Sequence, residues 1–300
     1  MRRGQLSLGR PKGGGLRILA PAKVNLFLAI LGKRADGYHE IVSVVDIISL
    51  YDVLHVEEVD RDEIFVADRE GVLEGGEGNS VYRAVKIVKE RFGIGRGMRI
   101  HIDKGIPIGG GLGGSSTDAA QTLKVLNQLW RLGLSMEEMI DLGKEIGSDV
   151  PLFLYGAPCI VRGRGERVEP FDLPRLTYLV VYPGIPLSAG DVYGSLEGPQ
   201  HGKDLPPRLE KGRLGLPLML RNDLEPAAIS LLPVIAEMKE EVNKSGAIGA
   251  LLCGSGSSVF GIFKSRAQLE EARLEMERRG WYTFIARSLR RQAKPWRSRR

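Results

Sequence analysis

Cysteine is scarce in this sequence. Only 2 of its 300 residues are cysteines, and Cys159 and Cys253 lie far apart, without the spacing of a metal-binding motif. The sequence therefore argues against a disulfide framework and against a cysteine-based metal site. Such cysteine usage fits a reducing compartment, and we expect the protein to be cytoplasmic.

Long apolar runs are missing as well. No stretch reaches the roughly 18 consecutive apolar residues of a membrane-spanning helix, and the basic N-terminus lacks the apolar core of a secretory signal. Apolar residues make up 43% of the chain and charged residues 27%, which is typical of globular proteins. A length of 300 residues favours two domains, and we expect no membrane partner.

Acidic residues are absent from both ends of the chain, residues 1–17 and 290–300. The basic residues of these ends are Arg2, Arg3, Arg10, Lys12, Arg17, Arg290, Arg291, Lys294, Arg297, Arg299 and Arg300. They account for the net charge of +6, because the rest of the chain is acidic overall. We expect two disordered basic tails, 1–15 and 290–300, with at most weak contacts to RNA or anionic surfaces. The folded body is not expected to bind nucleic acid.

The lysine of a Walker A phosphate loop is also missing, since no lysine occurs between Lys104 and Lys124. What is present is a glycine-rich loop that opens a helix predicted for residues 118–130. Such a loop directs unpaired N–H groups and the positive end of a helix dipole towards one point, which predicts a phosphate site. The residues of this site are Pro107, Gly109, Gly110, Gly111, Leu112, Gly113, Gly114, Ser115 and Ser116.

Two other interpretations of this loop fit less well. Gly109, Gly111 and Gly114 match the G-x-G-x-x-G pattern of dinucleotide-binding folds, but that pattern follows a fully apolar strand near the chain start. Here the preceding residues 98–104 alternate between apolar and polar, which is typical of a strand with one solvated face. A flexible linker is disfavoured because strand and helix patterns frame the loop.

Residues 16–31 predict two strands with an interruption at Pro21. Lys23 and Asn25 are two residues apart, so they share a face of the second strand, and Phe27 and Ala29 are expected to continue that face. A lysine and an asparagine on an otherwise apolar face need polar partners. The alternative is an edge position with both side chains in water.

Three further candidates come from two short segments. Tyr38 and His39 follow a turn at Asp36-Gly37 and start an apolar run, so they fit either a ligand contact or a strand edge. Asp149 follows a Gly-Ser pair and precedes an apolar segment. It fits either a helix N-cap or a catalytic base, and the sequence leaves both pairs of alternatives open.

The remaining patterns predict an α+β fold. Asn79-Ser80 is expected to cap a helix at 81–92, and Ser135 with Glu138 forms a capping box at the start of another. The second half predicts strands at 159–161 and 176–182, a long loop at 194–217, a helical stretch at 222–244 divided by Pro233, a strand-turn-strand unit at 248–263, a helix at 267–279 and a strand at 281–286.

Four segments together resemble the ordered motifs of the GHMP small-molecule kinases. They are residues 21–25, 107–120, 147–151 and 253–260, and the resemblance spans residues 18 to about 287. It implies a two-domain GHMP kinase fold. Residues 16–165 would form an ATP-binding domain like domain 2 of ribosomal protein S5, and residues 166–289 a ferredoxin-like substrate domain.

The segment 34–39 further resembles the branch of this family that acts on a diphosphocytidyl-linked methylerythritol. This implies transfer of the γ-phosphoryl group of ATP, with Mg²⁺, to the 2-hydroxyl group of that small-molecule substrate in non-mevalonate isoprenoid synthesis. By position, Lys23 and Asp149 are the catalytic pair, with Asp149 as the base and Lys23 as its electrostatic partner. The glycine-rich loop would cradle the ATP phosphates. The residues implied to contact substrate are Asn25, Tyr38, His39, Asp149 and Tyr193.

Two positions depart from the family pattern. The family loop usually reads Gly-Gly-Gly-Ser-Ser, whereas this chain has Gly-Gly-Ser-Ser-Thr at 113–117, which leaves open which hydroxyl faces the metal-bound phosphate. Ala189, beside Ser188, stands where threonine is common.

Two other functions remain as alternatives. A kinase of another small alcohol is disfavoured by the loop at 37–39, and a non-catalytic nucleotide- or RNA-binding protein is disfavoured by Lys23 together with Asp149. The sequence does not decide between a monomer and a homodimer, nor does it identify the direct Mg²⁺ ligands.

Overall fold

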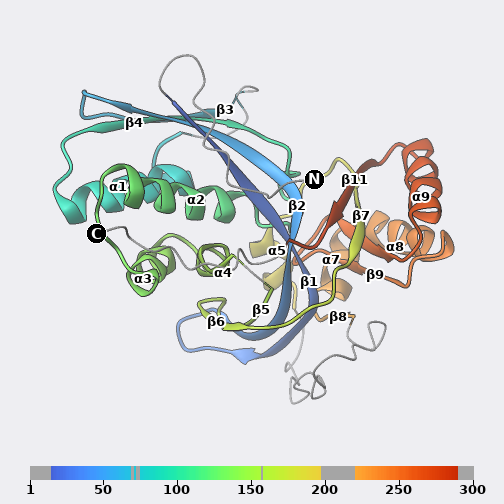
Figure 1. Ribbon diagram of the computed structural model, residues 1–300. Helices are drawn as coiled ribbons and strands as arrows, with labels where there is room; N and C mark the ends of the chain where they lie inside the picture. Colours follow the sequence, from blue (N-terminus) through green and yellow to red (C-terminus); the bar gives the residue numbers. More distant parts are fainter. Residues whose placement is uncertain (1–14, 69–70, 72–74, 157, 197–219, 290–300) are drawn as a thin grey trace.

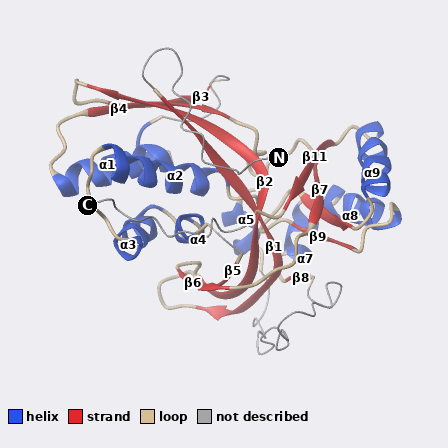
Figure 2. Cartoon of the chain, in the orientation of Figure 1, coloured by secondary structure: helices blue, strands red, loops and turns tan. Residues whose placement is uncertain are grey.

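Two β-sheets pack against each other in the middle of the molecule, and helices cover their outer sides (Figure 1). The computed structural model describes residues 15–289 except 69–70, 72–74, 157 and 197–219. From left to right, Figure 2 shows helices, the first sheet, the second sheet and helices again. This layering confirms the predicted α+β class.

The first sheet is built around two long strands, β1 (Leu16–Lys33) and β2 (His39–Val59), which pair antiparallel along most of their length. Strand β4 pairs antiparallel with β2, and β3 pairs parallel with β4. Strand β5 pairs antiparallel with the N-terminal part of β2 and also with β6. The short β8 pairs parallel with β1. The bounds of these strands are Ile64–Asp68 for β3, Gly97–Asp103 for β4, Cys159–Gly163 for β5, Arg167–Pro170 for β6 and Arg221–Asn222 for β8.

Four helices cover the outer face of this sheet. They are α1 (Ser80–Phe92), α2 (Gly114–Leu129), α3 (Met136–Ile146) and α4 (Val150–Tyr155), and a 3₁₀ turn at Gly76–Gly78 precedes α1. Buried aliphatic side chains such as Val85, Ile100 and Leu126 form the core between the helices and the sheet. Helix α2 contacts β1 directly, which brings the glycine-rich loop at its start against that strand.

The second sheet is antiparallel throughout, in the order β11-β7-β10-β9. Its strands are β7 (Thr177–Tyr182), β9 (Gly249–Leu252), β10 (Val259–Phe263) and β11 (Tyr282–Arg287), and the helices of this half are α5 (Ala189–Gly194), α7 (Glu225–Leu231), α8 (Val234–Lys244) and α9 (Arg266–Arg278). One face packs on the first sheet through side chains such as Val24, Tyr178 and Phe260. The other face is covered by α8 and α9.

Capping residues predicted from the sequence take up their expected roles. Asn79 accepts hydrogen bonds from the first turn of α1, and Ser135 and Glu138 form both bonds of a capping box at α3. Pro233 separates α7 from α8 as predicted. These helix boundaries are local properties of the chain, which explains why the sequence reveals them.

Two predicted boundaries are wrong. Residues 16–31 do not form two strands: β1 is continuous, and the pairing register with β2 shifts between Pro21 and Ala22. The unpaired residues at this bulge are Ser49 and Leu50 of β2, opposite Pro21, so the proline interrupts the ladder without ending the strand. Helix α2 begins at Gly114 rather than at Asp118, because the two serines and the threonine at 115–117 form its first turn.

Several sequence predictions fall outside these observations. The two predicted tails, 1–15 and 290–300, lie outside the described residues except for Gly15, and so does almost all of the predicted loop 194–217. The division between domains at residues 165 and 166 stays a prediction; β5 and β6 lie on either side of it and pair with each other. Within the described part of the chain, no helix is long and apolar enough to cross a membrane.

Candidate active site

Lys23 and Asn25 lie on the helix-covered side of β1 because of the bulge at Pro21. Ala20, before the bulge, belongs to the core beneath the helices, whereas Ala22, after it, belongs to the core between the sheets. The alternation of side chains along β1 thus reverses at this shift in register, so that Lys23 and Asn25 point towards α2 and α4.

Hydrogen bonds fix both polar side chains. Lys23 Nζ donates to Asn25 Oδ1 (2.7 Å), and Asn25 Nδ2 donates to Ser43 Oγ (2.8 Å) on β2. Lys23 and Asn25 are each only 5% exposed, which excludes the alternative that both side chains lie in water at a strand edge. Phe27 and Ala29 were expected to share this face, which is wrong: a second bulge after Asn25 turns them into the core between the sheets.

The glycine-rich loop lies directly beside Lys23. The N–H group of Lys23 donates to the carbonyl of Leu112 (3.0 Å). Gly113 occupies the N-cap of α2 at a φ of 77°, and no side chain caps the first turn. The first N–H groups of α2 therefore remain available to a ligand, as an anion site at a helix N-terminus requires.

The glycine-rich loop packs against two segments of the second half, the residue Leu187 and the turn 253–258 between β9 and β10. The N–H groups of Leu187 and Ser257 both donate to the carbonyl of Gly109 (3.0 Å each). A Cβ atom on Gly111 would lie 1.8 Å from the carbonyl oxygen of Cys253, so no larger residue fits there. The 253–258 turn, which was singled out in the sequence, is therefore part of the same site as the loop.

The three hydroxyl residues that follow the loop differ in exposure. Ser115 is exposed and Ser116 is half-buried at the start of α2. Thr117 is fully buried, and within the described structure its Oγ1 atom has no hydrogen-bond partner. Of the three side chains, those of the two serines are therefore accessible to a ligand and that of Thr117 is not.

Asp149 stands at the N-cap of α4, but its carboxylate makes no capping hydrogen bond. Its Oδ2 atom lies 3.6 Å from Lys23 Nζ, and 36% of the side chain is exposed. Two contacts tie α4 to α2: the Phe153 ring fills the space beside Gly113, and Lys124 Nζ donates to the Phe153 carbonyl (2.8 Å). Burial lowers the pKa of Lys124 to about 8. The acid–base candidate and the phosphate loop are thus held by one pair of helices.

A buried charge network that the sequence analysis missed supports the loop from below. Asp52 Oδ1 accepts the N–H groups of Gly105 and Ile106 (2.8 Å each), and Lys104 Nζ donates to Asp52 and to Asp118 Oδ2 (3.1 Å). Burial raises the pKa of Asp118, opposed by Lys104 and reinforced by Asp52. Lys104 and Asp118 flank the glycine-rich loop in the sequence, and this position is the one feature of the sequence that could have indicated the network.

Two of the candidate substrate residues, His39 and Tyr193, lie together near Asp149. Tyr193, on α5, stacks with His39 at a centroid distance of 5.2 Å and an interplanar angle of 27°. Burial lowers the pKa of His39, with a contribution from the charge of Lys33. Burial raises the pKa of Tyr193, and the nearby charge of Asp149 adds to the effect.

Tyr38 does not lie against this pair of rings. Its own ring is covered by the guanidinium of Arg164, at 4.9 Å from the centroid, and the residue is 50% exposed. The structure thus brings the rings of His39 and Tyr193 together, near Asp149, and places the ring of Tyr38 under Arg164.

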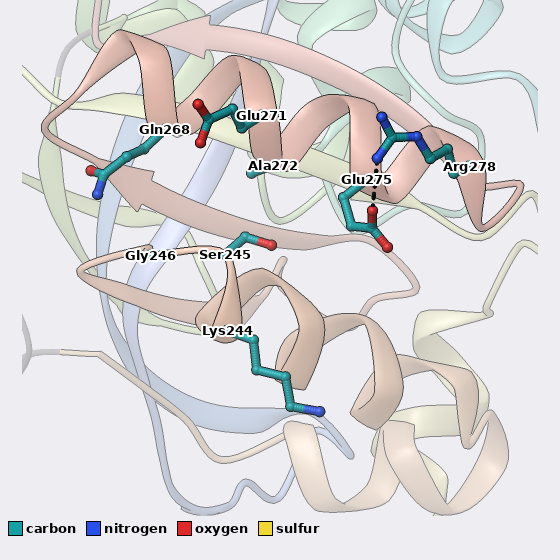
Figure 3. Close-up of a pocket in the computed structure, with 8 residues that line it drawn as sticks. All are labelled: Lys244, Ser245, Gly246, Gln268, Glu271, Ala272, Glu275 and Arg278. Carbon is teal, nitrogen blue, oxygen red and sulfur yellow. Dashed lines mark hydrogen bonds and ion pairs between the residues drawn. The ribbon is translucent and has the colours of Figure 1, made fainter.

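A separate hollow of about 450 Å³ lies between α8 and α9 (Figure 3). Its lining carries charges of both signs, including Lys244, Glu271, Glu275 and Arg278. It contains none of the residues that the sequence predicts for the site. The hollow is therefore separate from the candidate active site at the loop and Asp149.

Comparison with known proteins agrees with this geometry. Residues 79–157 match the model of the GHMP kinases N terminal domain, and residues 208–283 match that of the GHMP kinases C terminal domain. The chain is 39% identical over 258 residues to the 4-diphosphocytidyl-2-C-methyl-D-erythritol kinase of Shouchella clausii, covering 84% of this chain and 87% of the relative. The kinase of the same name from Caldicellulosiruptor bescii is 36% identical, with 84% and 90% covered.

The chain belongs to the 4-diphosphocytidyl-2-C-methyl-D-erythritol kinases of the GHMP family. This confirms the family that its motifs resemble, and membership makes ATP the phosphoryl donor.

Solved structures of GHMP kinases share the fold. The crystal structure of a 4-(cytidine 5'-diphospho)-2C-methyl-D-erythritol kinase superposes with a TM-score of 0.75 at 33% identity, covering 91% of this chain and 98% of that one. A homoserine kinase from Cytophaga hutchinsonii has a TM-score of 0.69 at 19% identity, with 94% and 96% covered, and shows the fold alone. The predicted two-domain GHMP kinase fold is confirmed.

Proposed function

We propose that this chain transfers the γ-phosphoryl group of ATP to the 2-hydroxyl group of 4-diphosphocytidyl-2-C-methyl-D-erythritol in non-mevalonate isoprenoid synthesis. The observation that carries the proposal is the Lys23–Asp149 pair beside the uncapped N-terminus of α2. The names of the relatives supply the substrate. A cytoplasmic location and a monomeric or homodimeric state stay predictions of the sequence.

ATP binds with its phosphates on the glycine-rich loop. The free N–H groups and the dipole of α2 attract the β- and γ-phosphates. Gly109 and Gly111 allow the loop to pass under the 253–258 turn, so the cradle is rigid before ATP arrives. Phosphoryl transfer depends mainly on positioning and charge, and a fixed cradle supplies positioning.

The residues around the loop fit Mg²⁺ as a partner of ATP. Among the described residues, no group of three or more His, Cys, Asp or Glu side chains could hold a metal ion. Mg²⁺ commonly binds through substrate phosphates and one or two protein oxygens. The accessible oxygens here are the hydroxyls of Ser115 and Ser116 and the carboxylate of Asp149. Bound there, the ion would neutralise phosphate charge.

Asp149 accepts the proton of the attacking hydroxyl group. Its carboxylate is partly exposed and makes no capping bond, so it is available to a substrate in the site. Lys23 is held by Asn25 at a fixed position between Asp149 and the loop. There its ammonium group compensates the negative charge that moves with the phosphoryl group.

The aromatic residues select the cytidine part of the substrate. Tyr193 offers a ring for stacking, His39 offers a neutral imidazole for hydrogen bonds to the base edge, and Tyr38 offers a second ring at the rim. A pocket that hydrogen-bonds a base edge discriminates strongly, because a wrong base leaves buried polar groups unpaired.

A coupled ADP-release assay tests the proposal. The cytidyl substrate is compared with its uridine analogue, with methylerythritol lacking a nucleotide, and with mevalonate and homoserine. We expect turnover only of the cytidyl substrate at micromolar to millimolar concentrations. Equal turnover of the cytidine and uridine compounds contradicts base recognition, and preferred turnover of mevalonate or homoserine identifies a different alcohol kinase.

A further inference from the structure

A tight turn joins β5 to β6 and presents a single arginine between two glycines. Gly163 and Gly165 flank Arg164 with φ angles of +77° and +128°. The N–H group of Arg164 donates to Glu166 Oε2 (2.7 Å), and that of Gly165 donates to the carbonyl of Arg162 (3.3 Å). The backbone of Arg164 is therefore fixed on both sides, and its side chain starts from a defined point.

This turn packs against the segment that carries Asp149. A Cβ atom on Gly165 would lie 2.7 Å from the carbonyl oxygen of Ser148, so only glycine permits the approach. Nη2 of Arg164 donates to the carbonyl of Lys144 near the C-terminal end of α3 (3.2 Å). Arg164 is thus anchored at the rim of the candidate active site.

The guanidinium of Arg164 lies over the ring of Tyr38, with Cζ 4.9 Å from the centroid, which is within cation–π distance. No carboxylate among the described residues lies within ion-pair distance of Arg164, although its charge acts on the nearby carboxylate of Asp36. The backbone of Tyr38 is also held, because its N–H group donates to Asp36 Oδ1 (3.2 Å) and its carbonyl accepts from Arg34 (2.8 Å). At 50% exposure, the ring retains surface for a ligand.

We propose that Arg164 is a positioning residue for the cytidyl substrate: its guanidinium holds one face of the Tyr38 ring, so that the other face meets the cytosine. This rests on the proposed function, in which Tyr38 contacts the base. A ring that is held beforehand loses less freedom on binding, which lowers the cost of binding. An arginine guanidinium is planar and stacks on aromatic faces, which suits it to this role.

The test measures KM for the cytidyl substrate, KM for ATP and kcat in Arg164→Ala. We expect KM for the cytidyl substrate to rise about 3- to 30-fold, with the other two constants changed less than about twofold. This range corresponds to about 0.7–2 kcal/mol, the span of a cation–π contact. Arg164→Lys should recover most of the loss, because an ammonium group is also attracted to the ring, whereas the neutral Arg164→Gln should not.

Arg162→Ala is the matched control. Arg162 belongs to the same hairpin, but its side chain pairs with Glu169 on β6 (3.4 Å), so its removal should leave all three constants unchanged. If Arg164→Ala does not fold, Arg164→Gln gives the same comparison with a side chain of similar length. A fall in kcat with an unchanged substrate KM overturns the proposal.

A double-variant cycle with Tyr38→Ala separates this inference from the proposed function. In the Tyr38→Ala background, Arg164→Ala should have no further effect on KM for the cytidyl substrate. An equal rise in both backgrounds means that Arg164 acts without Tyr38, which overturns the positioning role. If Tyr38→Ala raises this KM and Arg164→Ala does not, only the inference fails; if Tyr38→Ala leaves it unchanged, the base contact of the proposed function fails.

Discussion

A buried carboxyl group at the junction of the two sheets makes the stability of this protein depend on pH. Asp46, on β2, is fully buried, and its Oδ2 atom accepts hydrogen bonds from Tyr178 (2.7 Å) and Ser288 (2.5 Å). Burial raises the pKa of Asp46 from 3.8 to about 6, although both hydrogen bonds act to lower it. The folded protein therefore favours the protonated carboxyl group more than the unfolded chain does.

The sign and size of the effect follow from this difference in pKa. The stabilising contribution of the protonated form is fully present below about pH 4 and is lost as the pH rises through about 6. A difference of about two pH units corresponds to about 3 kcal/mol of unfolding free energy, of which about 2 kcal/mol falls between pH 4.5 and 7.5. Asp46→Asn keeps the shape of the side chain and removes the titration.

The assay is urea unfolding of the wild type and Asp46→Asn from pH 4.5 to 7.5. It is followed by tryptophan fluorescence and circular dichroism, whose coincidence supports a two-state treatment. As the pH rises, the unfolding free energy of the wild type should fall by about 2 kcal/mol relative to that of the variant. Any pH-independent effect of the buried amide cancels in this difference. The exposed Asp141 on α3 provides the control substitution, Asp141→Asn. A difference that stays constant within about 0.5 kcal/mol refutes the reasoning.

Three further predictions concern the site. Asp149→Asn should lower kcat by a factor of roughly 10² to 10⁴ with ATP binding retained, and Lys23→Met should lower kcat by a similar factor. In the double variant, the loss of kcat should be smaller than the product of the two single losses, because the two residues act as a unit. Near-normal turnover of Asp149→Asn in steady-state assays would contradict the assignment of Asp149 as the base. Tyr193→Ala should raise KM for the cytidyl substrate roughly 5- to 150-fold, because stacking is worth about 1–3 kcal/mol per base, and KM for ATP should not change; an unchanged substrate KM contradicts stacking. Gly113→Ala should weaken ATP binding in a calorimetric titration, because its Cβ would lie 2.7 Å from the phenyl ring of α4. Gly133→Ala, at a similar φ of 72° but with nothing within 4 Å, carries only the backbone cost of about 1–2 kcal/mol and should bind ATP normally.

Local signals in the sequence were enough to predict most elements of the fold. Asn79, Ser135 and Pro233 fix helix ends through bonds within a few residues, so their effect is visible without knowledge of the tertiary structure. The glycine-rich loop was found for the same reason. Short helices such as α5 were missed, because six residues carry too little periodicity.

The parts of the site that were not predicted depend on contacts between distant segments. The bulge at Pro21 sets which face Lys23 takes, and only the pairing of β1 with β2 reveals it. The position of Arg164 over Tyr38 joins residues 126 positions apart, so neither residue indicates the other in the sequence. Residue types and spacing predicted which groups take part, and the tertiary structure decided which of them face one another.

The hydrogen bond from Ser257 to Gly109 also has a consequence for synthesis of the chain. Translation delivers the phosphate loop long before the turn that supports it, because that turn follows β7, the helices α5, α7 and α8, and β9. A nascent chain on the ribosome therefore carries the loop without this turn until residue 258 has left the exit tunnel. Fragments that end before this turn lack the hydrogen bonds from Ser257 to Gly109 and from Ser258 to Gly110, so an N-terminal fragment that retains Lys23 and Asp149 should bind ATP more weakly than the whole chain.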